Sequence, residues 1–251
     1  YAHEFINSPD RLTTPLIKKD GKFVEATWDE AYDLIAEKFA SYKPGETACL
    51  SSARVSNEEN YLMMKFARAV LKTPHIDHCA RLCHASTVAG LAASFGSGAM
   101  TNSILDIAEA RCLFVLGSNT FEQHPLIGRK IVQAKQNGAK IIYADPRYTP
   151  TARQADLYMP FVSGADVAIL NGLMQEIIKN GWEDREFIAG RTKDYEKLKE
   201  VVMKETYSLE NVSQISGIPV ESLKQAAEWL GTNKPGAILY SMGITQHTVG
   251  V

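Results

Sequence analysis

The sequence predicts an α/β fold in which parallel strands form βαβ units with helices on both faces of the sheet. Three apolar runs typical of strands cover residues 111–116, 139–144 and 157–161. Helical patterns lie after the first run, over 125–136, and after the third, over 166–179, and an Asn-Gly pair closes each helix. Strands that alternate with helices in this rhythm indicate βαβ units and a parallel sheet.

The other expected elements continue the alternation along the chain. They are a helix capped by Thr27 that runs to about residue 39, a strand over 47–51, a helix from the capping box 56–59 to residue 70, a strand over 75–78, a helix from 86 or 87 to 91, helices over 195–204 and 220–230, and a strand over 237–240. We expect a partial α/β lobe over 1–78 and a second α/β lobe over 79–251, with no Gly/Ser-rich linker to mark the boundary.

Composition narrows the class of protein. Hydrophobic residues make up 45% of the 251 positions and charged residues 22%, which is ordinary for a globular protein. The formal net charge of −2 argues against nucleic acid as the main partner, because phosphate binding usually requires a basic excess. No apolar run approaches the roughly 20 residues that a membrane span needs, so no direct membrane insertion is expected.

The chain has four cysteines. Cys49 and Cys112 lie in strand-like apolar runs, and we expect them to be buried as small hydrophobic residues. A disulfide framework is not expected at this cysteine density in a chain of this length, which fits a reducing compartment. A cytoplasmic location is therefore favoured over a periplasmic one.

The strongest chemical signal is the segment 75–84, which holds three of the six histidines and two of the four cysteines. Covalent haem attachment requires C-x-x-C-H, and the spacing from Cys79 to Cys83-His84 is one residue too long. A structural zinc site needs four ligands, usually as two separated pairs, and the second pair is missing unless His75 and His78 converge with the two cysteines.

A reactive thiolate at Cys83 is the third interpretation. Cys83 precedes an expected helix N-terminus, where the helix dipole favours negative charge, and Arg81 and His84 are close enough in sequence to lower the pKa of its thiol further. Such a thiolate serves as a nucleophile or as a soft metal ligand. A buried cysteine beside a surface histidine is the alternative that spacing alone leaves open.

The segment 79–91, with the sequence CARLCHASTVAGL, resembles the active-site segment of formate dehydrogenases that carry a molybdenum or tungsten bis(molybdopterin guanine dinucleotide) cofactor. The resemblance extends over essentially the whole chain in collinear order. Its further motifs are FINSPDRLT at 5–13, WDEA at 28–31, GAMTN at 98–102, GSN at 117–119 with His124-Pro125, DPR at 145–147 and GAD at 164–166. The fold that the resemblance implies is that of the formate dehydrogenase and DMSO reductase domains.

The resemblance implies roles for individual residues. Cys83 matches the family's metal ligand and, with His84, its catalytic pair. The resemblance implies that the lobe over 79–251 is Rossmann-like and holds one guanine dinucleotide arm; the general rule that nucleotides bind beyond the carboxyl ends of parallel strands agrees with this. The candidate cofactor contacts are Asn119, Glu122, Asp145, Arg147, Gly164 and Asp166, with Arg54 and Asn57 after the first strand as weaker candidates. Turns alone would also account for Asp145-Pro146 and Gly164.

The family pattern also has parts that we expect outside this chain. The four cysteines of a 4Fe-4S cluster and a lysine between cluster and pterin would precede Tyr1, and a catalytic arginine would follow Val251. We also expect the lobe for the second pterin arm to lie outside this chain. We therefore expect an internal fragment of the alpha (catalytic) subunit that is inactive when isolated and binds its cofactor poorly or not at all.

The function expected of the whole protein is oxidation of formate to carbon dioxide, with electrons leaving through the pterin and the iron–sulfur cluster to electron-transfer subunits. His84 would orient formate or accept a proton, a role suited to the near-neutral pKa of histidine. The alternatives are a formylmethanofuran dehydrogenase, another molybdopterin oxidoreductase, and an α/β nucleotide-binding lobe without activity. Nitrate reductases are disfavoured, because histidine directly after the ligand cysteine is a formate-type feature.

Overall fold

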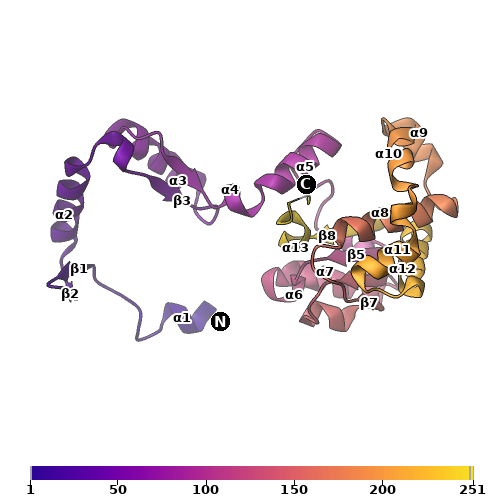
Figure 1. The fold of residues 1–251 in the computed structure, drawn as a ribbon. Coiled ribbons are helices and arrows are strands. Elements are labelled where there is room, and N and C mark those ends of the chain that lie inside the picture. The colour runs from indigo at the N-terminus through magenta and orange to yellow at the C-terminus, as the bar shows by residue number, and fades with distance from the viewer. Residues whose placement is uncertain (1, 249, 251) are drawn as a thin grey trace. The chain divides into compact units, whose positions relative to one another are not determined.

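A computed structural model describes residues 2–248 and 250, and the chain forms two compact units, Tyr1–Leu82 and Cys83–Val251 (Figure 1). The sequence placed a lobe boundary after His78, whereas the compact units divide after Leu82. No helix within the described residues is long and apolar enough to cross a membrane.

Among its described residues, the first unit contains two strand pairs, three complete α-helices and a 3-10 helix at Pro44–Glu46. Their bounds are α1 Ala2–Ile6, β1 Leu16–Lys19, β2 Lys22–Glu25, α2 Trp28–Ser41, β3 Cys49–Ser51, α3 Asn57–Lys65 and β4 Ile76–His78. The pair β1–β2 is an antiparallel hairpin, and β3–β4 is a parallel pair connected through α3 and a π-helical turn at Phe66–Val70. The helix α4, Ala80–Cys83, follows β4 along the chain.

Two capping boxes begin the long helices of this unit; the sequence predicted the box at Ser56 and, at Thr27, an N-cap residue. The Thr27 side chain accepts from the Glu30 amide, and the Glu30 carboxylate accepts from the Thr27 amide at 2.8 Å. Ser56 and Glu59 repeat this exchange at the start of α3. The bond from the Thr27 amide holds the pKa of the Glu30 carboxyl below its usual value.

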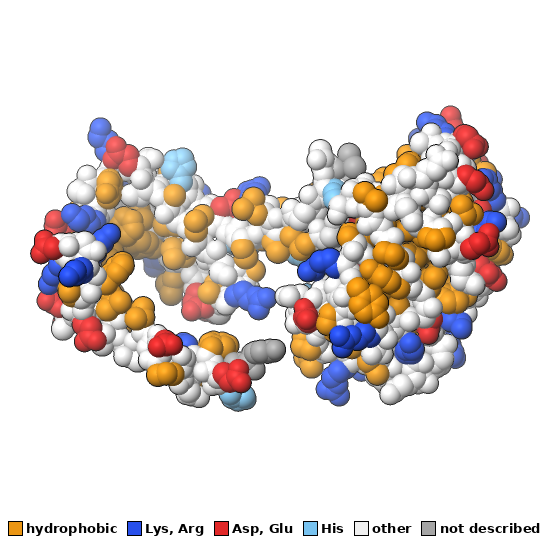
Figure 2. Space-filling model, turned by 60° about the horizontal axis from the view of Figure 1, so that its bottom comes forward, with side chains coloured by type: hydrophobic (Ala, Val, Ile, Leu, Met, Phe, Trp, Pro, Cys, Tyr) orange, Lys and Arg blue, Asp and Glu red, His pale blue; other side chains and the backbone are white. Residues whose placement is uncertain are grey.

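The core of the first unit is small. Its buried hydrophobic cluster consists of Cys49, Ala67 and Leu71, with Phe39, Met63 and Ile76 packed against it. Many large apolar side chains of this unit stay exposed, Phe23, Trp28 and Leu50 among them. Figure 2 shows hydrophobic side chains spread among charged ones on its surface.

The second unit is built on a four-stranded parallel sheet with the order β7-β6-β5-β8. Its strands are β5 Cys112–Leu116, β6 Lys140–Ala144, β7 Leu157–Met159 and β8 Gly236–Tyr240. Its helices are α5 Ala85–Phe95, α6 Thr120–Gln123, α7 Pro125–Gln136, α8 Asp166–Lys179, α9 Arg185–Arg191, α10 Tyr195–Val202, α11 Leu209–Ser216, α12 Val220–Thr232 and α13 Met242–Thr245.

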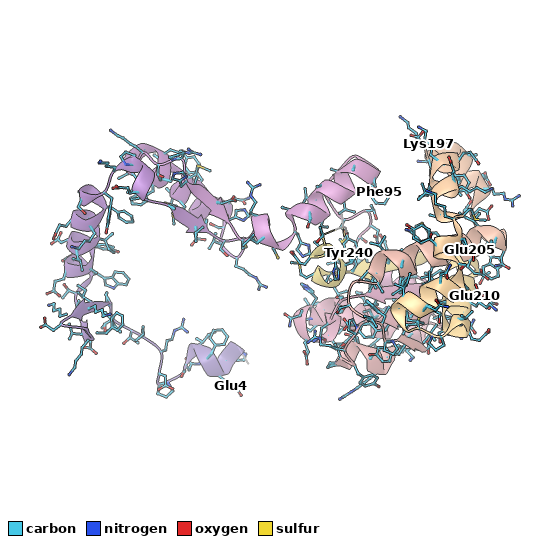
Figure 3. All side chains as sticks on the ribbon, in the orientation of Figure 1. Glu4, Phe95, Lys197, Glu205, Glu210 and Tyr240 are labelled. Carbon is cyan, nitrogen blue, oxygen red and sulfur yellow. The ribbon has the colours of Figure 1, made fainter. Side chains whose placement is uncertain are left out.

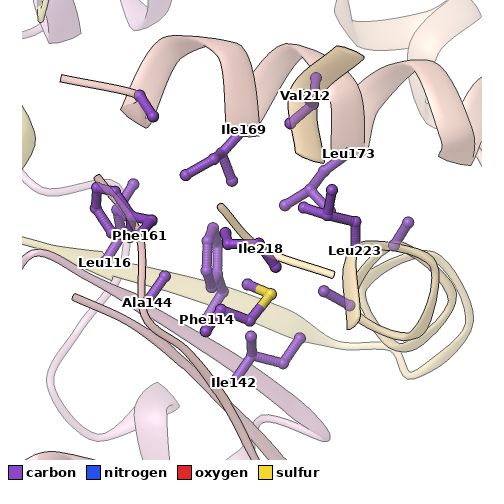
Figure 4. Packing of buried hydrophobic residues seen from close by; sticks show 14 of the residues in the cluster. Phe114, Leu116, Ile142, Ala144, Phe161, Ile169, Leu173, Val212, Ile218 and Leu223 are labelled. Atoms are coloured by element: carbon purple, nitrogen blue, oxygen red, sulfur yellow. The ribbon is translucent and has the colours of Figure 1, made fainter. Parts of the chain in front are cut away.

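Hydrophobic cores cover both faces of this sheet, since successive strand residues point to opposite faces. One face carries Phe114 and Ile142, which pack with Ile169 of α8 and Leu223 of α12 (Figure 4). The other face carries Leu113, Val115, Ile141 and Tyr143, which pack with Ile131 of α7. The predicted fold class, a parallel βαβ sheet with helices on both faces, is therefore confirmed.

Candidate active site

The carboxyl ends of three neighbouring strands of the second unit meet at one edge of the sheet. Leu116 at the end of β5 is paired with Ala144 of β6, and Ala144 is paired with Met159 of β7. The segments that leave these strands contain six of the predicted cofactor contacts, Asn119, Glu122, Asp145, Arg147, Gly164 and Asp166. This edge is where open parallel sheets bind nucleotides.

Beyond β5, Asn119 and Glu122 form a polar pair. The Asn119 side-chain amide donates to Glu122 Oε2. The other end of the same side chain, Asn119 Oδ1, is buried and has no hydrogen-bond partner among the described residues. A buried acceptor without a partner costs about 1–3 kcal/mol, so this atom is suited to receive a donor from a ligand.

Beyond β6, the Asp145 carboxylate is buried, with 5% of the residue exposed. Its Oδ1 accepts from the Arg147 amide at 2.8 Å, and the Tyr158 hydroxyl donates to the Asp145 carbonyl at 3.1 Å. Burial, with the charge of Asp145 as a second cause, raises the pKa of Tyr158. The Arg147 side chain is exposed at the same turn, where it can meet an anionic group such as a pyrophosphate.

Beyond β7, Gly164 and Asp166 bring the chain into α8. Gly164 has φ +95°, a conformation that side chains disfavour, and the space beside it is open. Asp166 is the first residue of α8, and its side chain is only 3% exposed. Its Oδ2 lies 3.2 Å from His247 Nε2 but accepts no well-oriented hydrogen bond from the described residues. A buried carboxylate of this kind is a strong acceptor for paired N–H donors.

The Cys83–His84 pair belongs to the same unit. Cys83 is exposed, ends α4, and stands two residues before α5. The sequence predicted a helix shortly after Cys83, from 86 or 87 to 91, but it did not predict α4. His84 is the N-cap residue of α5, and its Nδ1 lies 3.0 Å from Thr87 Oγ1. Arg81, expected to act on the Cys83 thiol, instead pairs with Asp77, because its Nε lies 2.8 Å from Asp77 Oδ2.

The segment 241–247 after β8 contacts this pair, and the sequence analysis did not single it out. Met242 Sδ lies 4.0 Å from Cys83 Sγ, and the Gln246 side-chain amide donates to the Cys83 carbonyl at 2.6 Å. Thr245 Oγ1 lies 2.8 Å from Thr87 Oγ1. The segment thus adjoins both Cys83 and the first turn of α5.

The two weaker candidates lie in the first unit. Arg54 follows β3, and its amide donates to Ser52 Oγ at 3.0 Å. Asn57 is the first residue of α3. The structure therefore groups the other predicted residues in the second unit and these two in the first.

An apolar cavity of about 230 Å³ lies along α5, from Ser86 to Phe95. Its walls come mainly from α5, from β8 and from the segment after β8, and Figure 3 marks Phe95 and Tyr240 among them. Thr87 and Thr245 also line it, so this cavity adjoins the hydroxyl groups next to His84.

The described residues do not form a metal site from protein side chains alone. No group of three or more His, Cys, Asp or Glu side chains suited to a metal ion occurs among residues 2–248. Cys49 and Cys112, which the sequence predicted to be buried, are both buried. Cys83 is left as an exposed thiol that offers one soft ligand.

Comparison with known proteins agrees with this geometry. The sequence profile of the family described as molybdopterin oxidoreductase matches residues 11–251. The chain belongs to the molybdopterin oxidoreductase family. The family implies a molybdopterin cofactor that carries molybdenum or tungsten.

Individual relatives extend the comparison. F420-dependent formate dehydrogenase 1 subunit alpha of Methanococcus maripaludis is 55% identical over the whole chain, which spans 37% of that relative's length. Formate dehydrogenase H of Escherichia coli is 40% identical, and the chain spans 36% of it. Acetylene hydratase from Pelobacter acetylenicus has a similar structure, with a TM-score of 0.76 over 95% of this chain and 33% of that one, at 27% identity.

The residues present fit such a cofactor. A pterin nucleotide has phosphate groups and a base with N–H donors, and the sheet edge offers an exposed arginine, a buried carboxylate at Asp166 and the unpartnered acceptor Asn119 Oδ1. Unpartnered buried acceptors at this edge are unfavourable without a ligand. The two buried acceptors and the exposed arginine therefore fit the N–H and phosphate groups of a nucleotide, and the exposed Cys83 offers one soft ligand for a metal.

Proposed function

We propose that this chain is part of the catalytic subunit of a formate dehydrogenase, which oxidises formate to carbon dioxide, one proton and two electrons. The observation that carries the proposal is the 55% identity to a formate dehydrogenase alpha subunit over the full length of this chain. The whole protein's partners are formate and the electron-transfer subunits that receive the two electrons.

In the finer assignment, the second unit holds one guanine dinucleotide arm of a bis(molybdopterin guanine dinucleotide) cofactor. Asn119, Asp145 and Asp166 accept hydrogen bonds from the nucleotide, Arg147 binds phosphate, and Gly164 shapes the turn. Glu122 orients Asn119, as their hydrogen bond indicates. Arg54 and Asn57 stay weaker predictions, as do a 4Fe-4S cluster in the N-terminal part of the whole protein and a cytoplasmic location.

The pterin-held metal, when bound, supplies the acceptor for the electrons of formate. Cys83 would provide a sulfur ligand to that metal from an exposed position before a helix N-terminus. His84 Nδ1 is engaged with Thr87, and Nε2 has no hydrogen-bond partner among the described residues, so Nε2 is the nitrogen available to orient formate or accept its proton.

The full-length protein tests this function through metal analysis and formate-driven viologen reduction. We expect molybdenum or tungsten in the wild-type protein and in Cys79→Ser, and loss of turnover in Cys83→Ser. Cys79 is the matched control because it is also exposed and lies four residues earlier. If metal-loaded wild-type protein reduces no dye with formate, the formate assignment is wrong. If Cys83→Ser keeps full turnover, the ligand assignment is wrong.

A further inference from the structure

A chain of three polar groups joins His84 to the segment after β8. His84 Nδ1 lies 3.0 Å from Thr87 Oγ1, and Thr87 Oγ1 lies 2.8 Å from Thr245 Oγ1. Both distances are within hydrogen-bonding range for a hydroxyl group. Each hydroxyl has one donor and two acceptor positions, so Thr87 can bond to the ring and to Thr245 at once.

Thr245, the last of the three hydrogen-bonded groups, is held in place by its surroundings. Thr245 is only 4% exposed, and its carbonyl accepts from Ser86 Oγ at 3.3 Å. Two residues earlier, the Gly243 amide donates to the carbonyl of Gly117, just past the end of β5. Thr245 is therefore held between α5 and the end of β5. Its hydroxyl group can fix the position of the Thr87 side chain.

The orientation of the His84 ring depends on its hydrogen bond with Thr87. His84 is an N-cap residue, but its side chain makes no capping hydrogen bond, so the helix backbone does not fix the ring. Among the described residues, Thr87 Oγ1 is the hydrogen-bond partner found for the ring. Without it, the imidazole is free to rotate about its side-chain bonds.

We propose that Thr87 and Thr245 are positioning residues that act in series to set the orientation of the His84 ring and keep Nε2 directed at the substrate. Neither hydroxyl is assigned a contact with formate. The Thr87 hydroxyl bonds to the His84 ring, and the Thr245 hydroxyl bonds to the Thr87 hydroxyl. The inference rests on the proposed function, and it assigns a role to two residues for which the sequence motifs implied none.

The variants Thr87→Val and Thr245→Val remove each hydroxyl with little change in side-chain shape. Groups that orient an active-site residue typically contribute about 10- to 100-fold. In the full-length protein we expect kcat for formate to fall at least about tenfold in Thr87→Val and less in Thr245→Val, with KM changed less than about threefold. Thr87→Ser keeps the hydroxyl and should recover most of kcat.

Two features separate this role from a structural one. Because the hydroxyls act in series, the double variant Thr87→Val/Thr245→Val should be no slower than Thr87→Val alone, whereas independent structural damage would add. Metal content and thermal stability should match those of the wild-type protein. Thr192→Val, an exposed position at the end of α9, is the control.

A readout independent of turnover is the rate at which diethyl pyrocarbonate modifies His84 in metal-free protein at fixed pH, followed by peptide mass spectrometry. Thr87→Val should raise this rate, because Nδ1 loses its partner, and Thr87→Ser should restore it. If wild-type protein oxidises formate but Thr87→Val matches it in kcat and in modification rate, the positioning role is refuted. If wild-type protein fails to oxidise formate, the proposed function fails, and the modification rates still decide the Thr87 contact.

Discussion

The Gly243 amide donates to the Gly117 carbonyl at 3.2 Å, so the segments that leave β8 and β5 meet backbone to backbone. A Cβ on Gly243 would lie 2.5 Å from Gly117 Cα, and a Cβ on Gly117 would lie 2.7 Å from Gly243 Cα. Side chains never approach backbone atoms so closely, so this contact requires glycine on both sides. It links the support of Cys83 and His84 to the sheet edge that carries Asn119.

Gly243→Ala should displace the segment 241–247 from β5. We expect a loss of about 1–3 kcal/mol in the free energy of unfolding, as for other overpacked sites, and weaker formate oxidation by the full-length protein. Gly236→Ala is the control, since a Cβ there meets its nearest atom at 3.7 Å. Urea unfolding measures both variants, and equal stability of the two would contradict the close contact.

The variant Asp166→Asn tests whether the Asp166 carboxylate accepts hydrogen bonds from a guanine base at the carboxyl edge of the sheet. Guanine presents two adjacent N–H donors to one carboxylate, and an amide replaces one of the two acceptors by a donor. We expect at least about tenfold weaker GDP binding by metal-free full-length protein in isothermal titration, in line with a charge-assisted hydrogen bond of about 1.5–3 kcal/mol. Inosine diphosphate lacks one donor and should bind the wild-type protein more weakly than GDP.

The control for this variant is Asp194→Asn, since the Asp194 side chain is exposed and pairs with Lys197 on the surface. It should leave GDP affinity unchanged. Equal GDP affinity of Asp166→Asn and wild-type protein, with the fold intact, would remove Asp166 from the nucleotide site.

Local patterns were enough to predict most of the second unit. The helix predicted over 166–179 is α8, Asp166–Lys179, because a first-turn acid and the pair Asn180-Gly181 mark its ends. The β1–β2 hairpin was not predicted, although Asp20-Gly21 carries the signal of a two-residue turn, and both residues have positive φ. Its strands have only four residues each and are mostly exposed, so no apolar alternation marked them.

The candidate site also has a part that the sequence predicted and a part that it did not. The place of Asn119, Asp145 and Asp166 at the sheet edge was predictable, because the strands were recognisable and the family resemblance supplied the motifs that follow them; their contacts with a cofactor stay predictions. The support of Cys83 was not predictable, since Met242 lies 159 positions away in sequence and no local pattern reports such a contact. The course of β8 beside β5 is what brings the two together.

Two isoleucines on parallel strands of the same sheet differ in burial and should differ in their contribution to stability. Ile142 of β6 is fully buried in the cluster with Phe114 and Leu223, whereas Ile238 of β8 is 58% exposed. Ile142→Ala should cost about 2–5 kcal/mol of unfolding free energy, because it leaves a cavity. Ile238→Ala should cost less than about 1 kcal/mol. Comparable losses in urea unfolding would contradict the burial difference.

Cys112 gives the second unit a pH dependence at alkaline pH. The residue has no exposed surface, and burial raises the pKa of its thiol from 9.0 to about 11. The unfolded chain therefore releases this proton at lower pH than the folded protein does, so folding stability falls as the pH rises from about 9 to about 11. The contribution is present in full below pH 9, and its loss amounts to at most about 3 kcal/mol.

The variant Cys112→Ala isolates this contribution, because other alkaline titrations are common to both proteins. Urea unfolding between pH 8 and 11 should show a steeper decline of stability for the wild-type protein than for Cys112→Ala. Iodoacetamide at pH 8.5 should modify the exposed Cys79 and Cys83 and spare Cys112, whose thiol is both protonated and buried. Parallel stability curves for the two proteins, or rapid alkylation of native Cys112, would show that its thiol is open to solvent and that strand β5 is not the buried centre of the sheet.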